Sequence, residues 1–106
     1  MDLEGQRDLR ILSELDRDAG ATQRTLATKL GVALGLTNLY LKRLARKGHI
    51  KITTIPHNRI RYLLTPQGFT EKSRLTYQYM QYSLSYYRDM RTRLKEMMST
   101  FDGSHG

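Results

Sequence analysis

The sequence predicts a mainly helical domain that carries one β-hairpin, an α+β arrangement, followed by a long helix. Over residues 6–47 apolar side chains recur at the three-and-four spacing of helices. Over residues 49–64 the period changes to two, which is typical of strands. Beyond Gly68 no helix-breaking residue appears until residues 102–103. We therefore expect two parts, residues 1–66 and residues 67–106.

Three short helices are expected first, at residues 6–19, 23–30 and 34–47. Thr22 is suited to cap the second helix, since its hydroxyl can accept a hydrogen bond from a free backbone N–H. A glycine follows each helix and is expected to stop it, because glycine readily adopts the left-handed conformation that ends helices. These glycines are Gly20, Gly31 and Gly48.

A hairpin follows, with strands at residues 49–53 and 59–64 and a turn at residues 54–58. Alternation predicts one apolar face on the second strand, and Arg59 and Arg61 on the other. The apolar face consists of Ile60, Tyr62 and Leu64.

The last helix is expected to begin at Thr65 and Pro66, a cap followed by the residue favoured at the first helical position. About 34 residues at ~1.5 Å each make a rod of roughly 50 Å, too long to pack on a domain this small. The tail, residues 103–106, is expected to be disordered.

The charge is concentrated in the middle of the chain. The net charge is +8, and residues 33–66 hold seven basic side chains and no acidic one. This balance favours a polyanionic partner, either nucleic acid or an anionic membrane. A membrane helix is disfavoured because Tyr, Ser, Thr and Gln fill the last helix where an apolar face is required.

Several classes of function are disfavoured by what the sequence lacks. There is no cysteine, and the three histidines are scattered, so we expect no metal site and no cofactor. No paired carboxylates, phosphate loop or nucleophile motif points to an enzyme. The acidic N-terminus does not resemble a signal peptide, and no apolar run could span a membrane, so a cytoplasmic location is expected.

The order of elements (helix, helix, tight turn, helix, hairpin) is that of a winged helix-turn-helix. The major groove of DNA admits one α-helix, so a reading helix must present an exposed face while a preceding helix braces it. The hairpin can then reach the backbone or the minor groove, where arginine is favoured. In the third helix Leu36 and Leu39 lie outside the buried stripe, so they either widen it or remain exposed.

Two stretches, residues 22–32 and 37–50, resemble the DNA-binding core of MarR-type winged-helix regulators. The residues that carry the resemblance are Thr22-Gln23-Arg24, Leu26-Ala27, Leu30-Gly31-Val32, Thr37-Asn38, Leu41, Leu44, Lys47-Gly48 and Ile50. The run Leu63-Leu64-Thr65-Pro66-x-Gly68 is similar to that family's exit from the wing into a dimerisation helix. Together with residues 71–76, this order most resembles the small EPS-associated MarR group, which is linked by name to exopolysaccharide gene clusters.

The sequence departs from the family pattern at three positions. Ala33 stands where a Ser or Thr cap is usual, which predicts a weaker helix start by ~1 kcal/mol. Leu36 and Leu39 stand where polar, base-facing residues are common.

We predict a DNA-contacting surface on the second helix, the third helix and the hairpin. Asn38 can make a bidentate contact to adenine, whereas Arg46 and Lys47 could instead complement the dipole at the helix end. The candidate DNA-binding residues are Gln23, Arg24, Leu36, Asn38, Leu39, Lys42, Arg43, Arg59 and Arg61.

Side chains at heptad spacing on the last helix predict a dimerisation seam, with parallel and antiparallel pairing both open. The seam consists of Met80, Ser83, Tyr87, Met90, Leu94 and Met97. Five of the seven tyrosines lie between residues 77 and 87, where they either pack an interface or line a small-molecule effector site.

The expected function is that of a homodimeric transcriptional regulator that binds double-stranded, palindromic DNA sequence-specifically. The alternative is a winged-helix scaffold for protein–protein interaction that does not bind DNA.

Overall fold

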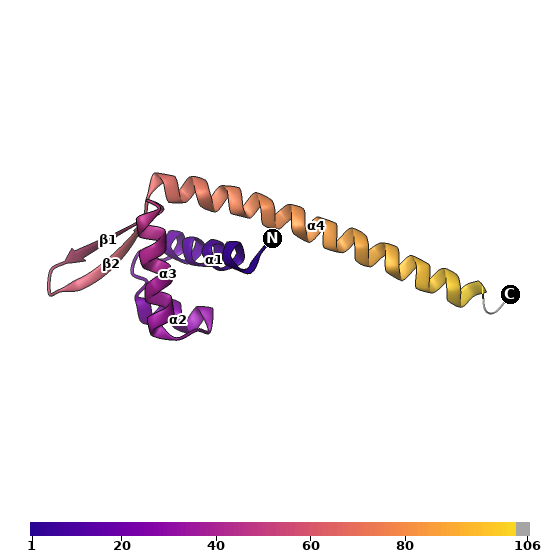
Figure 1. Cartoon of the computed structure of the whole chain (residues 1–106), viewed down its shortest axis with the longest axis horizontal. Coiled ribbons are helices and arrows are strands. Elements are labelled where there is room, and N and C mark those ends of the chain that lie inside the picture. The colour runs from indigo at the N-terminus through magenta and orange to yellow at the C-terminus, as the bar shows by residue number, and fades with distance from the viewer. Residues whose placement is uncertain (104–106) are drawn as a thin grey trace.

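The computed structural model describes the backbone of residues 1–103 and the side chains of residues 1–101. Its elements are α1 (Leu3–Arg17), α2 (Gln23–Leu30), α3 (Leu34–Arg46), β1 (Ile50–Ile55), β2 (Arg59–Leu64) and α4 (Pro66–Gly103). The three short helices and the hairpin form a compact head, and α4 runs along α1 and then extends far beyond it (Figure 1). The molecule measures 75 × 26 × 20 Å. The predicted fold class is confirmed. The disordered tail was expected at residues 103–106, but α4 continues through Gly103, so that part of the prediction was wrong. Residues 104–106 lie outside the described residues.

One apolar core holds the head together and ties the first part of α4 to it. Thr37 is the polar residue at its centre, and its hydroxyl donates to the Ala33 carbonyl at 3.1 Å, so that its burial leaves no unpaired hydroxyl. All of the helices and both strands contribute to the core, which consists of Ile11, Leu12, Leu15, Ala21, Leu26, Leu41, Leu44, Ile50, Tyr62 and Leu75.

Helix α1 differs from its prediction at both ends. It begins at Leu3 instead of residue 6, because the Asp2 carboxylate accepts a hydrogen bond from the Gly5 N–H at 2.7 Å and caps the helix earlier. The stop expected at Gly20 was wrong. The helix ends at Arg17, and Asp18, in an extended conformation, accepts from the Gly20 N–H at 2.9 Å.

The caps of α2 and α3 follow the sequence closely. Thr22 accepts from the Thr25 N–H, while the Thr25 hydroxyl oxygen accepts from the Thr22 N–H, which satisfies two free donors reciprocally. Gly31 ends α2 with a φ of 70°. Ala33 stands at the N-cap of α3 and makes no side-chain capping hydrogen bond, as its methyl side chain predicts.

The hairpin is longer than predicted. Thr54 and Ile55, expected in the turn, pair with Ile60 and Arg59, and only Pro56–Asn58 connect the strands. A positive φ at both His57 and Asn58 gives the sharp reversal that suits twisted hairpins.

The apolar face predicted for β2 is buried only in part. Tyr62 is in the core and Leu64 is half-buried, but Ile60 is exposed. The reason is visible in Figure 1, where the tip of the hairpin projects away from the helices.

The junction between β2 and α4 fixes the direction of the long helix. The Thr65 hydroxyl donates to the Gly48 carbonyl at 2.6 Å and accepts from the Gly68 N–H at 2.9 Å, which confirms the predicted cap. Gly68 lies so close to the backbone that a Cβ there would overlap the carbonyl oxygen of His49. One turn later Lys72 pairs with Asp16 of α1 at 2.6 Å. The first turns of α4 are therefore held against the head.

Candidate nucleic-acid interface

The outer surface of α3 has a polar edge and an apolar edge. Asn38 and Lys42 are one turn apart and share an edge, because residues four apart lie on the same side of a helix. Leu36, Leu39 and Arg43 follow at spacings of three and four and form the other edge. Lys42 is exposed and Asn38 half-buried. The structure thus presents these side chains outward, as a helix that enters the major groove requires.

The two basic residues that follow Asn38 have different surroundings. Lys42 makes no ion pair within the described part of the chain. Arg43 pairs with Glu4 of α1, with its Nη1 3.2 Å from the carboxylate, and the Lys47 Nζ lies 3.8 Å from the same oxygen. Lys42 is therefore available to a phosphate, whereas Arg43 and Lys47 are partly neutralised by α1.

A buried carboxyl lies close to this charged contact between α1 and α3. Burial raises the pKa of Asp8, and the nearby cations of Arg7, Lys47 and Arg43 oppose that rise. The Arg7 guanidinium carbon lies 3.7 Å from the centre of the Tyr40 ring, a cation–π contact between α1 and α3. The cluster therefore ties the N-terminal half of α1 to the outward-facing helix.

Gln23, predicted to contact DNA, uses its side chain within the protein. Its Nε2 donates to the Leu34 carbonyl at 3.1 Å, and its Oε1 accepts from the Tyr62 hydroxyl at 3.2 Å. Burial raises the pKa of that hydroxyl, which keeps it a donor. Gln23 therefore connects α2, α3 and β2, a role that no local sequence pattern indicates.

The wing arginines lie beside the start of α2. Arg59 and Arg61 are exposed on β2. With Thr22 and Gln23 they line a groove of about 690 Å³ between the hairpin and the loop that precedes α2. Arg24 is exposed in the first turn of α2. Positive charge and the N-terminal end of a helix, both favourable to phosphate, are thus brought to one side of the head.

These features agree with the comparison against known families. Residues 6–51 match the family described as winged helix-turn-helix DNA-binding. The match ends at the start of β1, and together with the rest of the hairpin these residues have the winged helix-turn-helix fold. In its terms α2 is the bracing helix, α3 the recognition helix and the hairpin the wing. No curated protein sequence matches this chain.

Solved structures share the fold of the winged helix-turn-helix domain and part of α4. PcaV, a transcriptional regulator from Streptomyces coelicolor, is 18% identical over 93% of this chain and 74% of its own, with a TM-score of 0.69. MepR, a transcription regulator of a Staphylococcus aureus multidrug efflux pump, is 23% identical, with a TM-score of 0.63. The similarity covers 95% of this chain and 80% of MepR.

A MarR-family regulator from a Rhodococcus species is 20% identical over 66% of this chain, with a TM-score of 0.60, and this chain covers 51% of that protein. A variant of MepR has been solved bound to an oligodeoxyribonucleotide. At these identities the similarity shows a shared fold.

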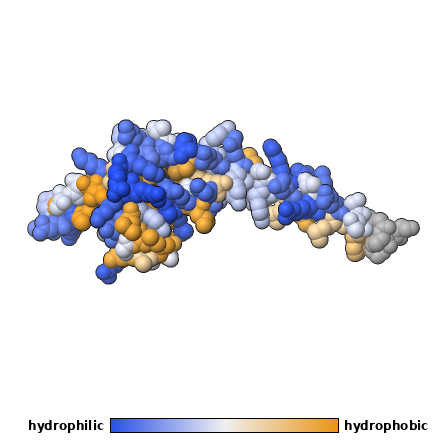
Figure 2. Space-filling view, viewed as in Figure 1, coloured by the Kyte–Doolittle hydropathy of each residue, from blue (hydrophilic) through white to orange (hydrophobic). Residues whose placement is uncertain are grey.

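Beyond the winged helix-turn-helix domain, the proposed seam on α4 is open to solvent. Ser83 is half-buried, and the other seam residues are exposed. In Figure 2 apolar atoms lie along the underside of the distal part of α4. The exposed members are Met80, Tyr87, Met90, Leu94 and Met97. The structure thus leaves this face free to contact a partner.

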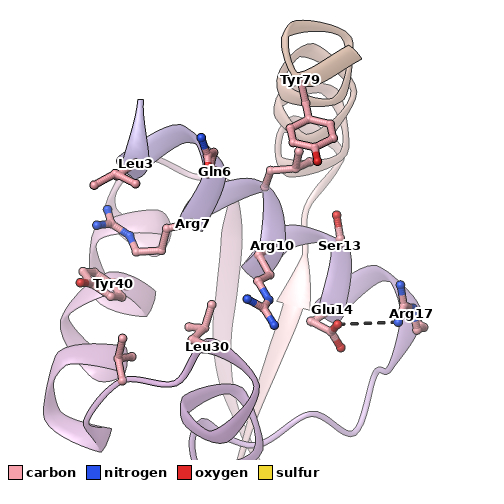
Figure 3. Close-up of a pocket in the computed structure, with 12 residues that line it drawn as sticks. Leu3, Gln6, Arg7, Arg10, Ser13, Glu14, Arg17, Leu30, Tyr40 and Tyr79 are labelled. Atoms are coloured by element: carbon pink, nitrogen blue, oxygen red, sulfur yellow. Dashed lines mark ion pairs between the residues drawn. The ribbon is translucent and has the colours of Figure 1, made fainter. Parts of the chain in front are cut away.

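A second groove, of about 690 Å³, lies where α4 passes α1. Figure 3 shows Tyr79 reaching from α4 toward α1, with Leu30 and Tyr40 on the opposite side. Of the five tyrosines between residues 77 and 87, Tyr79 alone lines this groove. The tyrosine cluster therefore does not converge on one cavity within the described chain.

Within residues 1–103 no helix is long and apolar enough to cross a membrane. Among the described side chains, those of residues 1–101, no group of three or more His, Cys, Asp or Glu is placed to hold a metal ion.

Proposed function

We propose that the protein is a transcriptional regulator that binds double-stranded DNA sequence-specifically as a homodimer, with the cytoplasmic location that this role implies. The observation that carries the proposal is the outward face of α3, where Asn38 and Lys42 lie within an acid-free basic stretch of the sequence that also contains the wing arginines. Asparagine reads adenine and lysine neutralises phosphate, so one face of one helix combines sequence recognition with affinity.

The dimer is proposed from the free apolar face of α4. Two recognition helices tied through this helix could meet successive major-groove faces about 34 Å apart, which implies a palindromic site. The solved MarR-family neighbours support assignment to that family. The run Leu63–Gly68, with residues 71–76, supports the finer assignment to the EPS-associated group.

The test is selection of binding sites from a randomised DNA duplex pool, followed by affinity measurements on the selected sequence. Asn38→Ala is expected to weaken the selected site by roughly 1–3 kcal/mol and to relax preference at one base pair per half-site. Lys42→Ala is expected to weaken selected and random DNA alike. If Asn38→Ala leaves both affinities unchanged, α3 is not the reading helix.

The alternative, a protein-binding scaffold, has one observation in its favour, the exposed leucines of α3. Salt dependence separates the two functions. Phosphate neutralisation predicts a steep fall of DNA affinity with salt, with a slope of about −0.9 per phosphate contacted. A scaffold would show no such DNA binding at physiological salt.

A further inference from the structure

The recognition helix exposes leucine where its charge predicts polar contacts. Leu39 is 62% exposed and Leu36 is 40% exposed, and both lie on the same edge of α3. Basic side chains follow directly, with Lys42 and Arg43 one turn further along the helix. The head packs no other element over these leucines. They therefore form an exposed apolar edge that is available to a binding partner.

The charge around the leucines limits what that partner can be. Residues 33–66 contain no acidic side chain. Glu4 of α1 pairs with Arg43 on this edge, but Lys42 makes no ion pair within the described chain, so the local charge favours an anionic partner. It must also offer apolar groups that a helix can reach. The major groove of B-DNA meets both requirements, because it admits an α-helix and displays the 5-methyl group of thymine among phosphates. The deep, narrow major groove of an RNA duplex does not admit such a helix.

We propose that Leu36 and Leu39 recognise thymine by packing against its 5-methyl group in the major groove. This inference rests on the proposed function and specifies the base that this edge of α3 reads. Asn38, which lies between the two leucines in sequence, is suited to adenine. Each half-site therefore contains A·T pairs at the positions that face α3, with thymine methyl groups turned toward the leucines.

The experiment removes the methyl groups from the DNA. A site is selected from a randomised duplex pool with the full-length wild-type chain, and each thymine is then replaced singly by deoxyuridine. Uracil keeps every hydrogen-bonding group of thymine and lacks only the methyl. At one or two positions per half-site, replacement is expected to weaken binding about fourfold, the effect of one buried methyl-sized group.

The leucine variants assign the effect to α3. Leu39→Ala and Leu36→Ala should bind the thymine site more weakly and should no longer distinguish thymine from uracil at those positions. Both side chains are exposed, so thermal unfolding should be unchanged. Leu3→Ala, at a leucine that is 82% exposed but lies on α1, is the matched control and should discriminate as the wild type does.

The outcomes separate this inference from the proposed function. A wild-type chain that selects no sequence would overturn both. A wild-type chain that selects a site but tolerates uracil at every position would overturn the thymine reading alone. If Leu39→Ala and Leu36→Ala leave all DNA affinities unchanged, the leucines do not contact DNA, and the inference is wrong.

Discussion

The fold buries the Asp8 carboxyl group without giving both of its oxygens a hydrogen-bond partner. The residue is 7% exposed, and its Oδ1 has no hydrogen-bond partner within the described chain. Arg7 lies 3.6 Å away. Burial disfavours the charged form and raises the pKa of Asp8, although the neighbouring cations reduce the effect. Asp8 is thus expected to cost stability whenever it is ionised.

We expect Asp8→Asn to be more stable than the wild type at neutral pH. Because the folded-state pKa lies above the ordinary value of 3.8, the folded protein binds the proton more tightly than the unfolded chain. Wild-type stability therefore falls as pH rises from that value through the raised pKa, and stays lower above it. Urea unfolding across this range should show the advantage of Asp8→Asn shrinking toward low pH.

The matched control is Asp89→Asn, at an exposed position on α4. It should change the unfolding free energy little at any pH. A neutral-pH loss of stability in Asp8→Asn would show that attraction to the cations outweighs burial.

At the scale of elements, α1 contacts α3 through an ion pair as well as through the apolar core. The Glu4 carboxylate pairs with two basic side chains at the C-terminal end of the recognition helix. These are Arg43, within α3, and Lys47, the residue that caps it. An exposed pair of this kind adds little to stability, so its effect should appear in DNA binding instead. Glu4 is positioned to reduce the affinity of α3 for phosphate.

Glu4→Gln is therefore expected to strengthen binding to random DNA several-fold. The slope of log affinity against log salt should steepen by about one unit for each cation released to a phosphate. The matched control is Glu14→Gln, which makes the same charge change on α1 but affects the pair with Lys29 of α2. Equal effects from both variants would indicate net charge alone and would contradict a specific role for Glu4.

The wing offers a second test of an element. Arg59→Ala with Arg61→Ala should flatten the salt slope by about one to two units, because two phosphate or minor-groove contacts are lost. Both side chains are exposed, so thermal unfolding should be unaffected. Arg91→Ala with Arg93→Ala removes the same charge from distal α4. A slope that the wing variant leaves unchanged, or that both variants flatten equally, would argue against wing contacts.

The whole molecule is extended, and this extension requires explanation. Its radius of gyration is 19.8 Å, whereas a compact chain of this length would have about 13 Å. The excess comes from α4, whose 38 residues span about 57 Å at ~1.5 Å each. Apolar side chains lie exposed along several turns beyond the head. A second copy of the chain is the simplest cover for this face.

Met90→Asp with Leu94→Asp places two charges in the proposed seam and is expected to give a monomer. The head should keep its thermal unfolding, because neither residue belongs to its core. Sedimentation at micromolar concentration measures the oligomeric state. As a control, Ser85→Asp with Thr92→Asp adds the same charge on the opposite side of α4 and should leave a dimer. A monomeric wild type, or a dimeric seam variant, would contradict this assembly.

The sequence alone determined the elements and most of their ends. Periodicity distinguished helix from strand, and Thr22, Gly31 and Thr65 marked boundaries that the structure confirms. These signals can be read because capping and side-chain periodicity depend on residues within about four positions of one another. The clustering of basic residues and the polar edge of α3 could be predicted for the same reason. Where two local signals competed, at Asp18 and Gly20, the prediction was wrong.

Tertiary structure decided how the elements are joined and which charges are free. Gln23 and Tyr62 are 39 residues apart, so no local pattern could show that Gln23 links α2 to the wing. The pairing of Glu4 with Arg43 likewise depends on how α1 lies against α3. The outward position of Leu39, which the sequence left open, arises because no element of the described chain packs over that edge. Such contacts arise only when the core brings distant segments together, because the backbone geometry of each element leaves its neighbours undetermined.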